Sequence, residues 1–429
     1  MKLKLKNVGK IEKAEIEING ITVIAGENNT GKSTVGKMLY CIFHSFYKIE
    51  QQIEDEKRKT IGRVLLNYYN EEYPFNKRIN TEKIVSDIID NKEIYTSNIG
   101  IELLTKRLNE IFVSDNETTY FNDEHLTELA GKIQKFLEFK NEDIADIILK
   151  KRLIAEFGMK VGYLNSPGSI SSVELDIQEQ KIDFEVINNE TVNIMNYFSL
   201  IKEIIYIDDP FVLDNIDHRS RLAYRFFNVF EHSVDLLTKI TDNRQESGFG
   251  VIDELFAKKR LERIFDTMNG VCDGDIVSDD NGNYTYKTDK LNDGLDMVNL
   301  STGLKSFVIL RTLLKNGRID DNGVIILDEP EIHLHPEWQL KFAEIIVLIQ
   351  REFKTNILLN THSPYFLNAI EVYSEKYGID EKCKYYMTDN IAGMTYINDV
   401  TNEREQIYAK LAKPLQDLEN MEYRNGDTI

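Results

Sequence analysis

The sequence predicts an α/β protein in which a parallel sheet with helices is interrupted by a mainly helical segment. Near the N-terminus, the apolar stretch Ile21–Ala25 is followed by a glycine-containing loop and a helical pattern over about Gly31–Tyr47. From Leu295 onward, helix and strand patterns alternate at short intervals, which is typical of a parallel sheet covered by helices. Between these parts, residues 48–160 are rich in Glu, Lys, Asn and Ile and show helical spacing, for example in Leu126–Phe139.

Alternating and apolar runs identify the expected strands. Because successive side chains of a strand point to opposite faces, alternation with period two predicts three hairpins: Lys2–Asn7 with Ala14–Ile18, Val173–Ile177 with Ile182–Val186, and one within Val271–Lys287. The unbroken apolar runs Ile204–Ile207 and Gly323–Leu327 are expected to be strands buried on both faces.

The chain of 429 residues has room for two or three domains, or for one core with a large insertion. The sequence shows no sustained heptad repeat, so we expect no long coiled coil. The expected parts are an N-terminal core segment (1–48), a helical insertion (49–160), core strands (161–217), a helical segment (218–268), a second core segment (269–400) and a C-terminal tail (401–429).

Composition and charge narrow the class of protein. The formal net charge of −20 makes the chain a poor candidate for coating nucleic acid, because phosphate contacts need clustered Lys and Arg. A local basic patch is compatible with the sequence but is not indicated by it. The scattered cysteines Cys41, Cys272 and Cys383 favour a reducing cytoplasm and argue against a cysteine zinc site. No apolar run is long enough to cross a bilayer, so we expect no membrane association.

Gly26–Ser33, with the sequence Gly-Glu-Asn-Asn-Thr-Gly-Lys-Ser, fits the phosphate-binding P-loop and lies between a short strand and a helix. Its glycines allow backbone N–H groups to turn toward a phosphate, Lys32 can reach the terminal phosphates, and Ser33 offers a hydroxyl to Mg²⁺. A chance match in a glycine-rich loop is the alternative, which the strand–loop–helix context disfavours. The residues expected to bind ATP are Gly26, Asn28, Asn29, Thr30, Gly31, Lys32, Ser33 and Thr34.

Two carboxylates, Asp328 and Glu329, directly follow the apolar strand Gly323–Leu327. Ligand chemistry in parallel sheets collects at the carboxyl ends of strands, so Asp328 is expected to hold Mg²⁺ and Glu329 to act as general base for the attacking water. The alternative, a capped helix start, does not explain the apolar strand in front. His362 follows another apolar strand and is expected to lie beside the γ-phosphate as a catalytic sensor or water-orienting group. A structural histidine is the alternative, which its place one strand after the Asp-Glu pair disfavours.

A further candidate anion site precedes the helix expected at Phe307–Lys315. Ser301 and Gly303 would lie at its N-terminus, where backbone N–H groups and the helix dipole favour an anion. An ordinary helix cap is the simpler interpretation of Ser-x-Gly. A second phosphate site in one chain is meaningful if it serves the nucleotide of a neighbouring copy.

These motifs, in this order, resemble those of ABC-type ATPases of the SMC-like and OLD-like group (AAA15 and AAA21 types). In this resemblance, Gly26–Ser33 corresponds to Walker A, Leu300–Lys305 to the signature motif, Ile325–Glu329 to Walker B, and Thr361–Pro364 to the switch histidine segment. Glu331–Gln339 resembles the D-loop of bacterial stand-alone members and contains His333 and His335, for which a metal site is the less favoured interpretation.

The resemblance implies a mixed sheet with flanking helices, an ABC-type core split by a helical insertion, and the ligands ATP and Mg²⁺. It also implies a homodimer or higher oligomer in which ATP lies between the Walker A loop of one copy and Ser301, Gly303 and Lys305 of the other. The Q-loop has no clear counterpart, and Gln51 and Gln52 are candidates only by residue type.

The region after His362 contains no Asp-x-Asp pair and no further histidine, so neither a Toprim nor an HNH nuclease is expected there. A short ATPase of this group without an effector domain resembles the ATPase subunits of the anti-phage systems Septu (PtuA) and PARIS (AriA). The resulting hypothesis is an ATPase that acts as sensor or scaffold for a separately encoded effector, such as a nuclease. The alternatives are a RecF-like DNA repair or recombination ATPase and, less favoured because the core is split, a transporter subunit.

Overall fold

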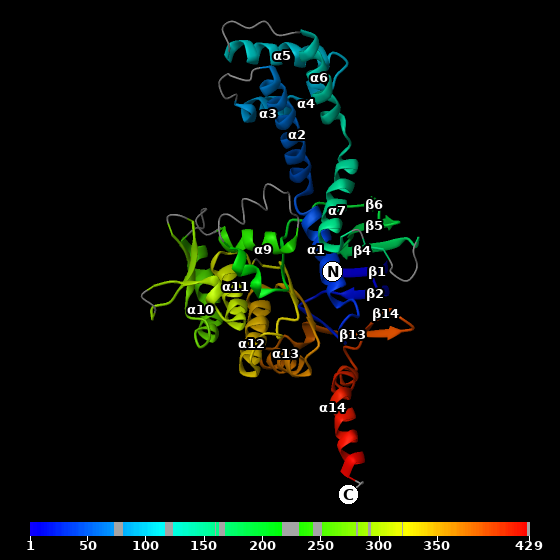
Figure 1. Ribbon diagram of the computed structural model, residues 1–429, viewed down its shortest axis with the longest axis vertical. Coiled ribbons are helices and arrows are strands. Elements are labelled where there is room, and N and C mark those ends of the chain that lie inside the picture. Colours follow the sequence, from blue (N-terminus) through cyan, green and yellow to red (C-terminus); the bar gives the residue numbers. More distant parts are fainter. Residues whose placement is uncertain are drawn as a thin grey trace. The chain divides into compact units, whose positions relative to one another are not determined.

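The computed structural model describes residues 1–72, 80–115, 123–158, 160–162, 168–216, 231–242, 251–279, 282–290, 293–319 and 321–426. The chain forms two compact units, one made of residues 1–47 and 149–429 and the other of residues 48–148 (Figure 1). The helical insertion was expected over 49–160. The second unit ends at Ile148, within helix α7 (Asn141–Phe157).

An 11-stranded sheet forms the centre of the first unit, in the order β6-β5-β4-β1-β2-β14-β13-β3-β12-β11-β7. Its strands are β1 (Lys2–Val8), β2 (Ile11–Glu17), β3 (Ile21–Ala25), β4 (Ser171–Ile177), β5 (Gln180–Ile187), β6 (Thr191–Asn196), β7 (Ile204–Ile207), β11 (Val324–Asp328), β12 (Asn356–Thr361), β13 (Cys383–Ile391) and β14 (Met394–Asp399). From β13 to β7 all neighbours are parallel, whereas β6, β5, β4, β1 and β2 are antiparallel. The sheet is therefore mixed, as predicted.

The expected hairpins are confirmed. Strands β1 and β2 pair with Leu3 opposite Ile16, and β4 pairs with β5 with Val173 opposite Phe184. A separate three-stranded sheet contains β8 (Asp275–Ser278), β9 (Tyr284–Lys287) and β10 (Leu295–Asp296). Its β8–β9 hairpin is the one predicted within Val271–Lys287.

Several helices and short 3-10 turns belong to the first unit. They are α1 (Lys32–Phe46), α9 (His232–Thr241), α10 (Val251–Met268), α11 (Thr302–Lys315), α12 (Pro336–Phe353), α13 (Pro364–Lys376) and α14 (Glu405–Gly426), with short 3-10 turns η1 (Pro210–Asn215), η3 (Met297–Asn299) and η4 (Asp380–Lys382). Helix α11 begins before the expected Phe307, because Ser301 caps it. Of the helical segment predicted over 218–268, residues 218–230 and 243–250 lie outside the described residues.

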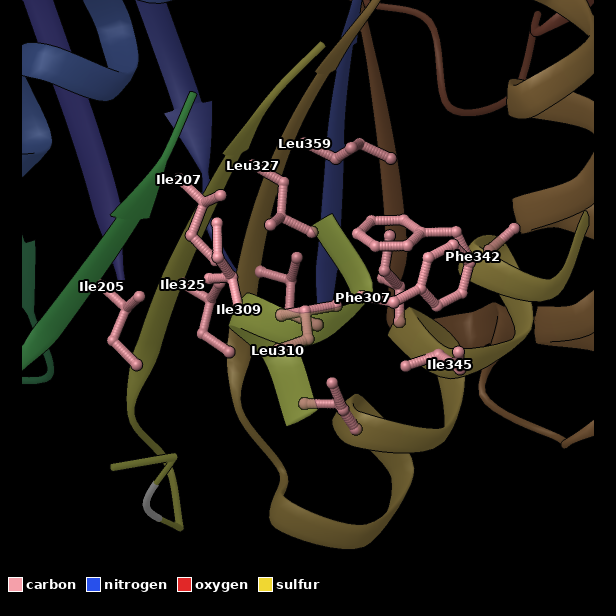
Figure 2. Close-up of a cluster of buried hydrophobic side chains, with 14 of the residues drawn as sticks. Ile205, Ile207, Phe307, Ile309, Leu310, Ile325, Leu327, Phe342, Ile345 and Leu359 are labelled. Atoms are coloured by element: carbon pink, nitrogen blue, oxygen red, sulfur yellow. The ribbon is translucent and has the colours of Figure 1, made fainter. Parts of the chain in front are cut away.

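The main core packs one face of the central strands against α11 and α12. Figure 2 shows Ile205 from β7 and Ile325 from β11 in the same cluster of buried side chains as Phe307 from α11 and Phe342 from α12. The two phenylalanine rings meet edge to face at 5.2 Å. Each such fully buried side chain contributes roughly 1.5–3 kcal/mol through the hydrophobic effect.

The second unit is helical and has a core of its own. It contains α2 (Ile49–Glu72), α3 (Thr81–Asp90), α4 (Lys92–Tyr95), α5 (Gly100–Asp115), α6 (Asp123–Glu138) and the start of α7. Ile88, Leu104, Phe112 and Ile133 are buried in its interior. In the part of the chain that is described, no helix exceeds the 24 residues of α2 and no long coiled coil occurs. None of the described helices is both long and apolar enough to span a membrane.

Candidate functional site

The predicted site residues of three segments meet at one edge of the sheet because three parallel strands are neighbours. Strand β12 lies between β3 and β11, with Thr361 beside Ala25 and Asn360 beside Asp328. The segments that follow these strands therefore begin next to one another. They are the loop Gly26–Ser33, the Asp328-Glu329 pair and His362.

The loop Gly26–Ser33 is shaped by close contacts with β13. A Cβ atom on Gly26 would lie 1.9 Å from the Thr388 hydroxyl oxygen, so only glycine fits there. Thr388 donates a hydrogen bond to the Thr30 hydroxyl at 2.9 Å, and Thr30 donates to the Glu27 carbonyl at 2.8 Å. Thr388, which carries no motif in the sequence, thus supports the loop from a neighbouring strand.

Helix α1 begins in a manner suited to an anion. Gly31 precedes it in the left-handed conformation (φ 86°) and supplies no side-chain cap, whereas Ser301, His335 and Ser363 cap α11, α12 and α13. The first-turn N–H groups of a helix have no partner within the helix. At α1 the Thr34 N–H bonds to the Gly31 carbonyl at 3.1 Å, but no side chain caps the helix. Its start and the positive end of the helix dipole therefore suit a phosphate, so the loop fits a nucleotide.

Lys32 turns back into the loop and is buried. Its Nζ donates to the carbonyl oxygens of Gly26 at 3.1 Å and Glu27 at 2.9 Å, and lies 3.4 Å from Oε1 of Glu329. These contacts hold the ammonium at the mouth of the loop. A phosphate bound by Lys32 would compete with these oxygen atoms for the ammonium group.

Asp328 and Glu329 have different surroundings. Asp328 is buried, and its two oxygens accept hydrogen bonds from the Tyr206 hydroxyl and from Nδ2 of Asn360, each at 3.0 Å. Glu329 has a left-handed backbone (φ 49°), which is unfavourable for a residue with a Cβ and is often found at functional sites. Its carboxylate lies 3.4 Å from both Lys32 Nζ and His362 Nδ1. The pair does not cap α12, since His335 does so.

His362 is held through its backbone, by a carboxylate that the sequence did not single out. Glu331 is buried and accepts hydrogen bonds from the Thr361 hydroxyl and from the His362 backbone N–H, the latter at 3.3 Å. Its second oxygen has no hydrogen-bond partner among the described residues. Burial raises the pKa of the Glu331 carboxyl above its usual value.

The start of α11 and the segment before α12 form an open pocket of about 280 Å³. A Cβ atom on Gly303 would lie 3.0 Å from the His333 carbonyl oxygen and 3.3 Å from the Trp338 ring, so glycine permits the two segments to approach. The pocket is lined by Ser301, Thr302, Gly303, His333, His335 and Trp338.

The other predicted site residues have different surroundings. Lys305 is buried in an ion pair with Asp214, 5.1 Å above the Phe211 ring, and does not line the pocket. Asn28 and Asn29 are exposed, and Ser33 and Thr34 are half-buried. Gln51 and Gln52 lie in α2 of the second unit.

Ser33 and Asp328 are the candidate oxygen donors for a metal ion. Among the residues described, no group of three or more His, Cys, Asp or Glu side chains could hold a metal. Ser33 and Asp328 would supply two oxygen ligands, and Mg²⁺ commonly takes few protein ligands, phosphates and water. His333 packs against the Phe211 ring, and Nδ1 of His335 accepts a hydrogen bond that caps α12.

Comparison with known proteins identifies related sequences and structures. Residues 1–367 match the family described as AAA ATPase domain. The chain is 27% identical over 208 residues to the Septu protein PtuA of Bacillus thuringiensis, covering 44% of this chain and 48% of that protein. It is 26% identical over 207 residues to the retron Vc95 probable ATPase of Vibrio cholerae, covering 42% and 37%. The match thus spans less than half of each of these two relatives.

Solved structures show weaker likeness. The SMC head domain from Thermotoga maritima has a TM-score of 0.39 and 11% identity, covering 93% of this chain and 98% of that one. An ATP-binding cassette of an ABC transporter has a TM-score of 0.32 and 12% identity, covering 95% and 99%.

The buried Glu331 carboxyl predicts a pH dependence of stability. Folding raises the pKa of the Glu331 carboxyl, so the folded chain binds the Glu331 proton more tightly than the unfolded chain does. The contribution of Glu331 to the free energy of unfolding therefore falls as pH rises from the usual glutamate pKa through the raised pKa. Glu331→Gln should abolish this contribution, so the variant gains stability relative to the wild type as pH rises from 4.5 to 8. Urea unfolding followed by fluorescence of Trp338, the single tryptophan, measures it.

The exposed Glu337 in the first turn of α12 provides the control, because Glu337→Gln makes the same chemical change at an exposed position. The urea midpoint of Glu337→Gln relative to the wild type should change less with pH than that of Glu331→Gln. A pH-independent difference between Glu331→Gln and the wild type would contradict the burial argument.

Proposed function

The chain belongs to the AAA ATPase domain family, and on that premise we propose that it binds ATP at the sheet edge formed by β3, β12 and β11 and hydrolyses it. The observation that carries the proposal is the meeting of an uncapped helix start, a buried lysine and two unlike carboxylates at one edge. The first two elements suit phosphate binding. The carboxylates suit metal binding and proton transfer.

Each residue has a role that follows from its surroundings. Backbone N–H groups of the loop and Lys32 would hold the phosphates, and Ser33 and Asp328 would hold Mg²⁺. When bound, MgATP supplies the phosphoanhydride bond and a metal that withdraws charge from the phosphates. Glu329 would accept the proton of the attacking water, and His362, 3.4 Å from Glu329, would orient that water.

The open pocket at the start of α11 supports assembly around ATP. The N-terminus of α11 carries Ser301, whose Oγ accepts from the Leu304 N–H at 3.4 Å, and is exposed. The pocket that it shares with His333 and His335 is open to a partner molecule. We propose that it binds the phosphates of ATP held by a second copy, so that binding joins the copies and hydrolysis releases them.

The relatives support a role in phage defence. One is a Septu protein and one a retron ATPase, and both match this chain over part of their length. The proposal is that the ATP-dependent assembly acts as sensor or scaffold for a separately encoded effector, such as a nuclease. The helical unit of residues 48–148, which has its own core, is the proposed surface for that partner.

Glu329→Gln should slow ATP hydrolysis by about 100-fold or more while preserving ATP binding, because only the proton acceptor is lost. ATP-bound assemblies should then accumulate in light scattering. Lys32→Ala is the matched variant and should abolish binding of a fluorescent ATP analogue. Hydrolysis by Glu329→Gln at the wild-type rate would refute the assignment of the base.

Ser301→Arg should weaken ATP-dependent self-association by about tenfold or more, because a bulky charge would be buried between copies. The residue is exposed in a single copy, so the melting temperature should stay within the wild-type range. Analytical ultracentrifugation with and without ATP measures the effect. Unchanged association of a folded Ser301→Arg would rule out this pocket as the contact.

The effector should co-purify with the chain when the adjacent gene product is co-expressed, and cells carrying both genes should resist phage. Lys32→Ala and Glu329→Gln should lose that protection in plaque assays. Absence of a bound neighbour together with unchanged phage sensitivity on deletion would remove the defence role, leaving the ATPase proposal intact.

A further inference from the structure

Asp328 accepts a hydrogen bond from a tyrosine that belongs to no sequence motif. Tyr206, on β7 next to β11, is fully buried, and its hydroxyl donates to Oδ2 of Asp328 at 3.0 Å. Asn360 donates to the other oxygen at the same distance. One donor on each oxygen fixes the rotation of the carboxylate and leaves its remaining lone pairs for another ligand.

Tyr206 is itself held by a histidine with two acidic partners. Its ring stacks on His232 at a centroid distance of 4.4 Å and an interplanar angle of 28°. His232 Nδ1 lies 2.7 Å from Glu156 and Nε2 lies 2.9 Å from Asp208, so both nitrogens face carboxylates. Burial alone would lower the pKa of His232, but these two carboxylates outweigh it and raise the pKa to about 9. The imidazolium therefore cannot rotate without losing an ion pair.

Tyr206 also touches the helix that follows the phosphate loop. A Cβ atom on Gly36 of α1 would lie 3.5 Å from the Tyr206 hydroxyl oxygen and 3.0 Å from Cγ2 of Ile326. The absence of a side chain at Gly36 thus lets the hydroxyl lie against α1, one turn beyond Ser33. The same hydroxyl contacts both the helix that begins with the loop and the carboxylate of β11.

We propose that Tyr206 is a positioning residue that orients Asp328 for metal binding, with His232 holding the tyrosine ring by stacking on it. This inference rests on the proposed function, in which Asp328 holds Mg²⁺. Hydrogen bonds from outer residues orient metal ligands, and their removal typically costs about 10- to 100-fold in metal affinity. A tyrosine that served only to fill the core would be replaced by phenylalanine without effect on the metal.

The test compares two tyrosines of the same cluster. Tyr206→Phe removes the hydroxyl that reaches Asp328. Tyr40→Phe removes a buried hydroxyl that has no hydrogen-bond partner among the residues described, on a ring 6.1 Å away. Mn²⁺ binding in the presence of a non-hydrolysable ATP analogue, followed by electron paramagnetic resonance, reports metal affinity without turnover.

Tyr206→Phe should weaken Mn²⁺ binding by about 10-fold or more, while Tyr40→Phe leaves it within twofold of the wild type. Binding of the analogue without metal should be equal in all three proteins. In hydrolysis assays, excess Mg²⁺ should restore most of the Tyr206→Phe rate, which a general loss of folding would not allow.

Asp208→Asn tests the contribution of His232 with a variant that keeps a hydrogen-bond acceptor and is expected to fold. It should weaken Mn²⁺ binding in the same direction but less than Tyr206→Phe does. Wild-type metal affinity in Tyr206→Phe would overturn the inference while leaving the proposed function intact. Failure of the wild-type chain to bind the analogue would instead refute the proposed function itself.

Discussion

The parallel register of β3, β12 and β11 places Ala25 beside Thr361 and Asp328 beside Asn360, and every contact at the sheet edge depends on it. A slip of one residue would turn each side chain to the opposite face of the sheet. The core on one face of the strands, where Phe307 and Phe342 pack, makes such a slip costly because the strand side chains buried in it would leave it (Figure 2). Hydrophobic packing against the strands therefore fixes the strand register, and the register in turn positions the polar residues at the sheet edge.

The sheet edge collects buried charged groups, and the fold stabilises each of them differently. Lys32 has two carbonyl oxygens and a carboxylate, and Asp328 has two neutral donors. Glu331 is left with one oxygen that has no partner among the described residues. Burial of charge is unfavourable unless it is paired, so such a concentration is expected where a ligand is bound rather than where stability alone is selected.

Sequence reasoning found the groups that follow directly on an apolar strand and missed those that approach from elsewhere. The loop Gly26–Ser33, Asp328 and His362 each follow such a strand. Tyr206 is an ordinary member of an apolar run, and Thr388 lies on a strand without a motif. Lys305, expected in the signature contact, lies on the buried face of α11 in an ion pair with Asp214, because two residues after Gly303 the helix presents a different face.

The sequence by itself determined the local chemistry: a glycine loop before a helix, paired carboxylates after a strand, and the α/β class with a helical insertion. These depend on neighbours along the chain and on side-chain periodicity. Only the tertiary structure decided that β13 lies beside β3 and supports the loop through Thr388, and that β7 brings Tyr206 to Asp328. Strand order brings together segments that are far apart in the chain. Any sequence can make the backbone hydrogen bonds between strands, and no short motif encodes the side-chain packing that selects the neighbours, so local patterns do not predict the order.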